Sequence, residues 1–76
     1  MDRLAAMQTF VRVVESGSFS AVARETRSTQ SGVSKQVAAL ERELGAKLLS
    51  RTTRSLALTE AGERYFAQAR RLVAEI

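Results

Sequence analysis

The sequence contains no cysteine and no histidine. Disulfide bonds are therefore excluded, and so is any metal site built from cysteine and histidine ligands. No uninterrupted apolar run approaches the ~20 residues that a membrane-spanning helix needs. Asp2 stands where a secretory signal peptide would be basic, and Gln8 and Thr9 interrupt the short apolar stretch that surrounds them. We therefore expect a cytoplasmic protein without a membrane segment, a metal or a cofactor.

Proline is also absent, and no low-complexity or linker-like segment divides the chain. The 76 residues fit one small domain. Lysine and arginine number 12 against 8 aspartate and glutamate, which gives a net charge of +4. This balance favours a polyanionic partner, usually nucleic acid, although many basic domains bind nothing acidic. The positions of the charges must therefore decide the matter.

Residues 3–16 are expected to form the first helix, because their apolar members recur at steps of three and four. That apolar face consists of Leu4, Met7, Phe10, Val11 and Val14. Gly17 should end this helix, since glycine readily adopts the left-handed conformation common at helix ends. A short second helix should cover residues 20–27, with Ser18 or Ser20 as its N-cap.

A third helix should follow Thr29, a good N-cap residue, and end at Leu44 before Gly45. Its apolar stripe consists of Val33, Val37, Leu40 and Leu44. Beyond Gly45 the pattern alternates, which predicts two short strands around a Thr–Arg–Ser tip. Thr59 should then cap a fourth helix that stays periodic to the last residue. The apolar face of that helix consists of Tyr65, Phe66, Ala69, Leu72, Val73 and Ile76.

This order of elements predicts a mainly α fold, the winged helix-turn-helix. It comprises three helices, a short two-stranded wing and a fourth helix. In such a fold the second helix of the helix-turn-helix pair enters the DNA major groove, and its first residues reach base edges. Here that helix is the third of the chain.

The start of the third helix suits this role, because no acidic residue lies between Thr26 and Leu40. Small residues there allow close approach to DNA, and backbone N–H groups can bind phosphate. These small residues are Thr29, Ser31, Gly32 and Ser34. Gln30 can pair with an adenine edge, and Lys35 can donate to guanine or to phosphate. We expect Gln30, Ser34 and Lys35 on the face opposite the apolar stripe.

The hairpin between Leu44 and Thr59 also has basic residues and no acid. Its basic residues are Lys47, Arg51 and Arg54. Arginine at a hairpin tip suits a narrow minor groove or the flanking phosphates.

Simpler interpretations stay open for the same residues. Polar residues at a helix start are common caps whatever the function. Lys35 alone is more often a solvated lysine, and charged hairpin edges also discourage aggregation. Tyr65 and Phe66 fit packing or dimer contacts better than a platform for nucleobases.

The chain resembles the LysR-type transcriptional regulators in three runs that follow one another in register. They are F-x-x-V-x-E-S-G-S-F-S-x-x-A (10–23), T-Q-S-x-x-S-K-Q-V-x-x-L-E-x-E-L-G-x-K-L (29–48) and R-T-x-R-x-x-x-L-T-E-A-G (51–62). The resemblance implies a winged helix-turn-helix domain over residues 1–58. From residue 59 it implies the start of a linker helix that pairs two subunits, followed in the family by an effector-binding domain.

The resemblance also implies which residues touch DNA and which partners the protein has. Base and phosphate contacts fall on Thr29, Gln30, Ser31, Ser34 and Lys35. Wing contacts fall on Arg51, Thr52, Thr53 and Arg54. The implied partners are a partly palindromic double-stranded DNA site and a second copy bound through the fourth helix, with a tetramer as the larger assembly.

Four positions depart from the family pattern. Ser31 stands where proline is usual, and Lys35 stands where arginine is common. Thr26 and Ser28 replace apolar residues that close the turn against the core, so we expect a slightly less stable turn.

Two other functions were weighed against DNA binding. A winged-helix domain used for protein contact would work through its fourth helix. Such a face would mix both charge signs or expose aromatics, unlike the wing and the part of the third helix before Glu41, which contain no acidic residue. An enzyme is disfavoured, because without histidine its acid–base chemistry would fall to carboxylates. Glu41 and Glu43 lie two residues apart on a helix and so point in different directions.

Overall fold

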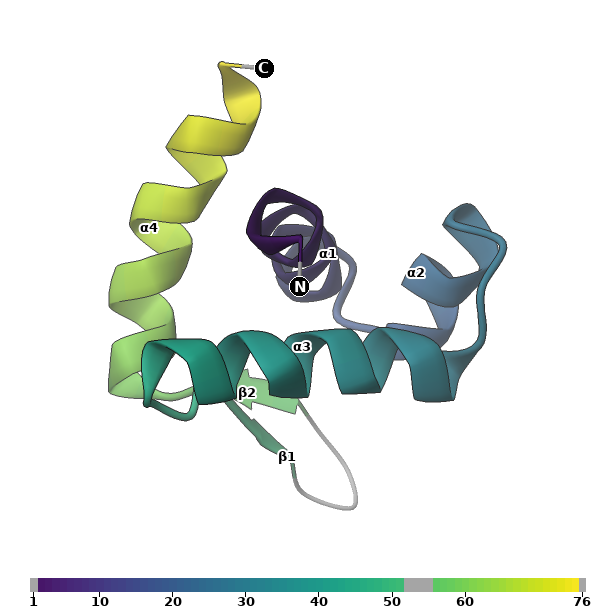
Figure 1. Ribbon diagram of the computed structural model, residues 1–76, viewed down its shortest axis with the longest axis horizontal. Helices are drawn as coiled ribbons and strands as arrows, with labels where there is room; N and C mark the ends of the chain where they lie inside the picture. The colour runs from purple at the N-terminus through teal and green to yellow at the C-terminus, as the bar shows by residue number, and fades with distance from the viewer. Residues whose placement is uncertain (1, 52–55, 76) are drawn as a thin grey trace.

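The computed structural model describes residues 2–51 and 56–75. Within them the chain forms helices and one small antiparallel sheet, arranged as a winged helix-turn-helix (Figure 1). The elements are α1 (Arg3–Ser16), α2 (Phe19–Glu25), α3 (Gln30–Leu44), β1 (Leu49–Arg51), β2 (Leu56–Leu58) and α4 (Glu60–Ala74). The predicted fold class and element order are confirmed. None of the described helices is long and apolar enough to cross a membrane.

Polar side chains cap the start of each described helix. Asp2, Ser18, Thr29 and Thr59 each accept a backbone N–H three residues on, at 2.9–3.1 Å. Because Ser18 and not Ser20 is the cap of α2, this helix starts one residue earlier than predicted. It also ends two residues earlier, at Glu25, since Arg27 takes a left-handed conformation with φ 55° that no helix can continue.

The core gathers around α1, which packs against α2, α3 and α4. Phe10 is fully buried at its centre. The ring centroid of Phe10 lies 5.6 Å from that of Tyr65 and 6.4 Å from that of Phe66, both on α4. Helix α4 therefore shares one core with the winged part, and the boundary expected between residues 58 and 59 stays a prediction.

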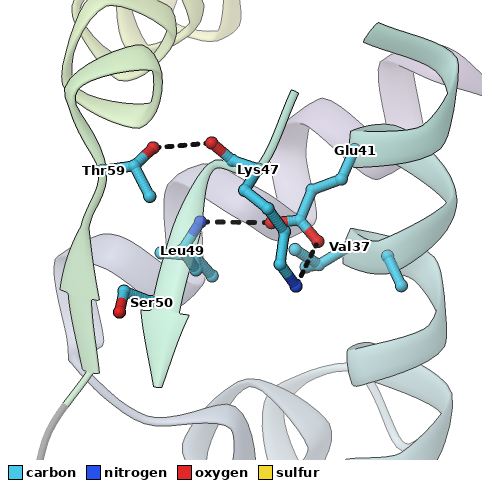
Figure 2. Close-up of a pocket in the computed structure, with 7 residues that line it drawn as sticks. Val37, Glu41, Lys47, Leu49, Ser50 and Thr59 are labelled. Atoms are coloured by element: carbon cyan, nitrogen blue, oxygen red, sulfur yellow. Dashed lines mark hydrogen bonds and ion pairs between the residues drawn. The ribbon is translucent and has the colours of Figure 1, made fainter. Parts of the chain in front are cut away.

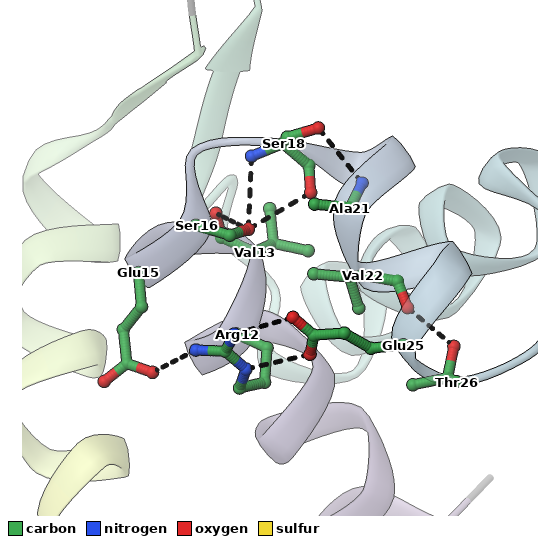
Figure 3. A network of polar contacts seen from close by, with 9 residues as sticks. All are labelled: Arg12, Val13, Glu15, Ser16, Ser18, Ala21, Val22, Glu25 and Thr26. Carbon is green, nitrogen blue, oxygen red and sulfur yellow. Dashed lines mark hydrogen bonds and ion pairs between the residues drawn. The ribbon is translucent and has the colours of Figure 1, made fainter.

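Arg12 ties α1 to α2 (Figure 3). Its guanidinium donates two hydrogen bonds to the Glu25 carboxylate, at 3.1 and 2.7 Å, and one to Glu15 at 2.8 Å. The hydrogen bonds to Glu25 and then Glu15 raise the pKa of Arg12, and the same guanidinium lowers the pKa of Glu25. This fork joins the C-terminal end of α2 to α1.

The turn between α2 and α3 contains Thr26 and Ser28, the two polar residues at positions where the resemblance implies apolar ones. The Thr26 hydroxyl donates to the Val22 carbonyl at 2.9 Å and lies 2.7 Å from the Ser28 hydroxyl oxygen (Figure 3 shows the first contact). The Ser28 N–H donates to the Ala23 carbonyl at 2.9 Å. Hydrogen bonds thus replace the apolar closure that other family members are expected to use.

The junction between the wing and α4 is held by Thr59. Its hydroxyl donates to the Lys47 carbonyl at 2.6 Å, and its backbone N–H donates to the Leu48 carbonyl at 3.0 Å. Helix α4 then ends at Ala74 with Glu75 as its C-cap, although the sequence predicts a helix through the last residue. The final carbonyls of any helix lack intrahelical donors, so the last turn is its weakest part. Ile76 lies outside the described residues.

Gly62→Ala tests the close approach of α4 to Leu48, in the segment between α3 and β1. A Cβ on Gly62 would overlap the Leu48 carbonyl group, which is backbone and cannot move aside. We expect a loss of about 3 kcal/mol or more in the free energy of unfolding, measured by urea denaturation.

Gly45→Ala is the matched control. Its added Cβ would contact no other atom, so the only cost is the strain of alanine in a left-handed conformation at φ 70°. Its loss should be about 1–2 kcal/mol. Equal losses for the two variants would contradict the packing described for Gly62.

Tyr65→Phe tests a buried polar atom in the core. The Tyr65 hydroxyl is buried without a hydrogen-bond partner among the described residues, so the phenylalanine variant should be more stable at pH 7 by about 1 kcal/mol. Desolvation raises the pKa of Tyr65, opposed by the charge of Arg3. Above pH ~10 the unfolded chain loses the phenol proton while the folded chain keeps it, so stability falls as pH rises.

The advantage of the phenylalanine variant should therefore widen between pH 9 and pH 11. Taking the difference between the two proteins cancels the titration of lysines. A difference that stays constant across this range would show that the phenol is solvated.

Candidate nucleic-acid interface

Helix α3 buries one side and exposes the other. Val33, Val37 and Leu40 are buried in the core. Lys35 is exposed on the opposite side, as predicted, and Ser31 is exposed as well. Gln30 is exposed, but its side chain bonds to Ser20 of α2. Ser34 is half-buried at the edge of that side, so the expectation that it points fully away from the core is only partly met.

The N-terminal end of α3 is polar and free of acidic side chains in its first turn. Thr29 caps it, accepting the Gly32 N–H at 2.9 Å. Gln30 leans toward α2, where the Ser20 hydroxyl donates to its Oε1 at 3.1 Å. The first N–H groups of any helix lack intrahelical acceptors and form the positive end of its dipole. This end is therefore suited to an anionic partner.

The wing is a two-stranded ribbon beside α3 (Figure 1). Leu49 pairs with Leu58, Ser50 with Ala57, and Arg51 with Leu56. The predicted strands are confirmed. Thr52, Thr53 and Arg54 lie outside the described residues, and only the backbone of Arg51 is described.

Glu41 connects the wing to α3 (Figure 2). Its Oε2 accepts the backbone N–H groups of Leu48 and Leu49, at 2.8 and 3.1 Å, and its Oε1 lies 3.9 Å from the Lys47 ammonium nitrogen. The Glu41 side chain is only 12% exposed. A cavity of about 590 Å³ separates α3 from β1 beside this contact. Glu41 therefore sets the wing's position relative to α3, a role its sequence position did not reveal.

Glu43 is paired on the other side of α3. Its Oε1 accepts a hydrogen bond from Arg3 of α1 at 2.6 Å, and this bond lowers the pKa of Glu43. Both acidic residues of α3 are thus engaged by the protein itself, Glu41 by the wing backbone and Glu43 by Arg3. The exposed charge in the N-terminal half of α3 is that of Lys35.

The predicted dimerisation residues of α4 differ in exposure. Ala69 is buried, and the rings of Tyr65 and Phe66 lie against Phe10. Val73 is half-buried against the core, whereas Leu72 is 52% exposed. Ile76 lies outside the described residues. Among the described members of this set, Leu72 has the most surface left for a second chain.

No group of three metal-ligating side chains comes together in the part of the chain that the structure describes. Glu41, a carboxylate that lines a cavity, has its oxygens occupied by backbone N–H groups and Lys47. What the described residues do form is an exposed, polar helix end next to an antiparallel ribbon. That arrangement defines a winged helix-turn-helix DNA-binding domain.

Comparison with known proteins places this domain in a family. The model of the bacterial regulatory helix-turn-helix proteins of the lysR family matches residues 4–63. The chain is 49% identical over 76 residues to the HTH-type transcriptional activator AaeR of Escherichia coli K12, and 50% identical over 70 residues to the regulator CrgA of Neisseria meningitidis. These matches cover 100% and 92% of the chain. The chain spans about a quarter of the length of these relatives.

Solved structures agree with this placement. The BenM DNA-binding domain in complex with catB site 1 DNA matches with a TM-score of 0.88 and 35% identity, over 95% of this chain and 81% of that one. The CbnR DNA-binding domain in complex with DNA matches with a TM-score of 0.85 and 34% identity, over 93% and 82% of the two chains. The chain belongs to the LysR family of transcriptional regulators, as its helix-turn-helix DNA-binding domain. It is a regulatory module and not an enzyme.

Three structurally important residues were not predicted from the sequence. They are Ser20, Glu41 and Gly62. All three stand in the family motifs, and the sequence predicts a cap role for Ser20 and no partner for Glu41 or Gly62. Each contacts a residue of another segment, Ser20 and Glu41 across one turn and Gly62 across the wing, where helical or strand periodicity gives no signal.

Proposed function

We propose that this domain reads a specific double-stranded DNA sequence with α3 in the major groove and the wing on the minor groove or flanking backbone. The acid-free, exposed N-terminal end of α3 carries the proposal. Ser31 and Lys35 face outward there, and Gln30 stands at its first position. BenM and CbnR, whose DNA-binding domains this chain resembles, are both seen in complex with DNA.

Each predicted contact has a distinct chemical task in this proposal. Gln30 and Ser34 contact base edges, and Lys35 contacts guanine or a phosphate. Thr29 and Ser31 sit close to the backbone, where the N–H groups of the first turn of α3 meet phosphate oxygens. Arg51, Thr52, Thr53 and Arg54 contact the minor groove or its phosphates. Positive side chains supply most of the affinity, which therefore falls steeply with salt.

The parent protein is proposed to be a bacterial transcription regulator that works in the cytoplasm, where the chromosome lies. It binds a partly palindromic operator as a homodimer through residues 59–76, or as a tetramer. Leu72 is the centre of the proposed dimer contact, because a large apolar side chain that is 52% exposed on α4 gains by burial. The two-fold symmetry of a homodimer matches the two-fold symmetry of a palindromic DNA site.

Selection of bound sequences from random duplex DNA tests the proposal directly. An enriched two-fold site, with affinity that falls steeply across a salt series, is the expected result. Binding without enrichment would overturn sequence reading. Absence of binding at low salt would favour the protein-contact function instead.

Gln30→Ala should weaken binding to the enriched site by ~1–3 kcal/mol and leave binding to random DNA nearly unchanged, because a base contact is lost and no phosphate contact is. Fluorescence anisotropy with the two DNAs measures both affinities. Gln68→Ala removes the same amide from an exposed position on α4 and should change neither. Equal losses on both DNAs would rule out base reading by Gln30.

Leu72→Ser should weaken dimerisation roughly tenfold or more, since the same leucine contributes from both subunits of a two-fold interface. Sedimentation equilibrium across a concentration series measures the dissociation constant. Because Leu72 is half exposed, the fold itself should lose little stability. Arg71→Ser, at the neighbouring exposed position, is the control and should dimerise normally. An unchanged dissociation constant for Leu72→Ser would move the interface elsewhere.

A further inference from the structure

Ser20 lies on α2 and reaches the first residue of α3 across the turn. Its hydroxyl donates to Gln30 Oε1 at 3.1 Å. The two helices pack directly together, and Figure 1 shows α2 above the N-terminal end of α3. Ser20 is half-buried, whereas Gln30 is exposed. The more buried hydroxyl therefore holds an amide that would otherwise rotate freely in solvent.

The helix that carries Ser20 is itself firmly held. Phe19, Val22 and Ala23 are buried in the core, and Glu25 is clamped by Arg12. Ser20 thus stands on a fixed support, and its short side chain has only one rotatable bond before the hydroxyl. A hydrogen bond from such a support restrains the much longer Gln30 side chain.

The chemistry of the Gln30 amide leaves room for DNA. A glutamine amide has two N–H donors on Nε2 and two acceptor lone pairs on Oε1. Ser20 uses one lone pair. One lone pair and both donors remain. In a bidentate contact with adenine, Nε2–H donates to adenine N7, and the remaining lone pair of Oε1 accepts an N6–H of adenine. The bonds to Ser20 and to adenine can therefore exist together.

We propose that Ser20 is a positioning residue that holds the Gln30 amide ready to read an adenine in the major groove. This inference rests on the proposed function, because it needs Gln30 to contact a base. A glutamine side chain loses much rotamer freedom when it binds, and restraining it beforehand lowers that loss. Ser20 acts through Gln30 and does not itself contact the base.

Ser20→Ala removes the hydroxyl and leaves a residue that favours helix, so α2 should fold as before. We expect a three- to tenfold weaker affinity for the enriched DNA site, the range that follows from freeing one side chain. Affinity for random DNA should not change. At the A·T pair that Gln30 reads, the preference over G·C should shrink. Ser20→Thr keeps the hydroxyl and should restore both the affinity and the preference.

A double-mutant cycle with Gln30→Ala decides whether Ser20 acts through Gln30. In the Gln30→Ala background, Ser20→Ala should have no further effect on DNA binding. Thermal unfolding of all four proteins checks that stability does not follow the change in affinity.

Three outcomes would overturn the inference. An equal effect of Ser20→Ala in both backgrounds, or on random DNA, would mean that Ser20 contacts a phosphate directly. If Ser20→Ala left DNA affinity unchanged while Gln30→Ala weakened binding to the enriched site only, the positioning role of Ser20 would be refuted. The proposed function would still stand. If Gln30→Ala left the base preference unchanged, base reading by Gln30 would be refuted. The positioning role of Ser20 would then be refuted as well, because it acts through Gln30.

Discussion

The burial of Phe10 is the constraint on which the rest of the structure depends. Its ring is fully enclosed, and Tyr65 and Phe66 of α4 lie against it. Helices α2 and α3 pack on α1, the helix that carries Phe10. A chain of 76 residues has room for one such core. The surfaces left for a partner are therefore the outer sides of elements whose inner sides pack into this one core.

The hydrophobic effect has no direction, and side-chain packing still leaves a range of angles between packed helices. Directional polar contacts at the edge of the core narrow this range. The Arg12 fork sets α2, the Glu41 carboxylate sets the start of β1 against α3, and Thr59 sets the turn into α4. In the proposed docking, α3 and the wing contact two grooves at once, and these polar contacts set the position of α3 and the wing relative to each other in the protein alone. Preorganisation of this kind reduces the free energy lost on binding.

The same contacts organise the charge of the binding face. Glu41 and Glu43 are both in the C-terminal half of α3, and the protein neutralises each of them internally. The N-terminal half has Lys35 and hydroxyl or amide side chains. A helix that contains two acids thus presents an uncharged-to-positive end to an anionic partner. Net charge alone does not reveal this arrangement, because the net charge of +4 says nothing about where each sign lies.

The sequence by itself determined the helices, the caps Thr29 and Thr59, the glycines that end α1 and α3, the order of the elements and the candidate face of α3. These features depend on residues within four positions of one another, where helical periodicity and capping preferences are strong. It misjudged the bounds of α2, because the left-handed Arg27 is set by the turn, and it placed Ser34 farther from the core than the structure does. Only the tertiary structure decided the roles of Ser20, Glu41 and Gly62. Each of these roles depends on a contact with a residue of another element, and that contact forms only when the helices pack around Phe10.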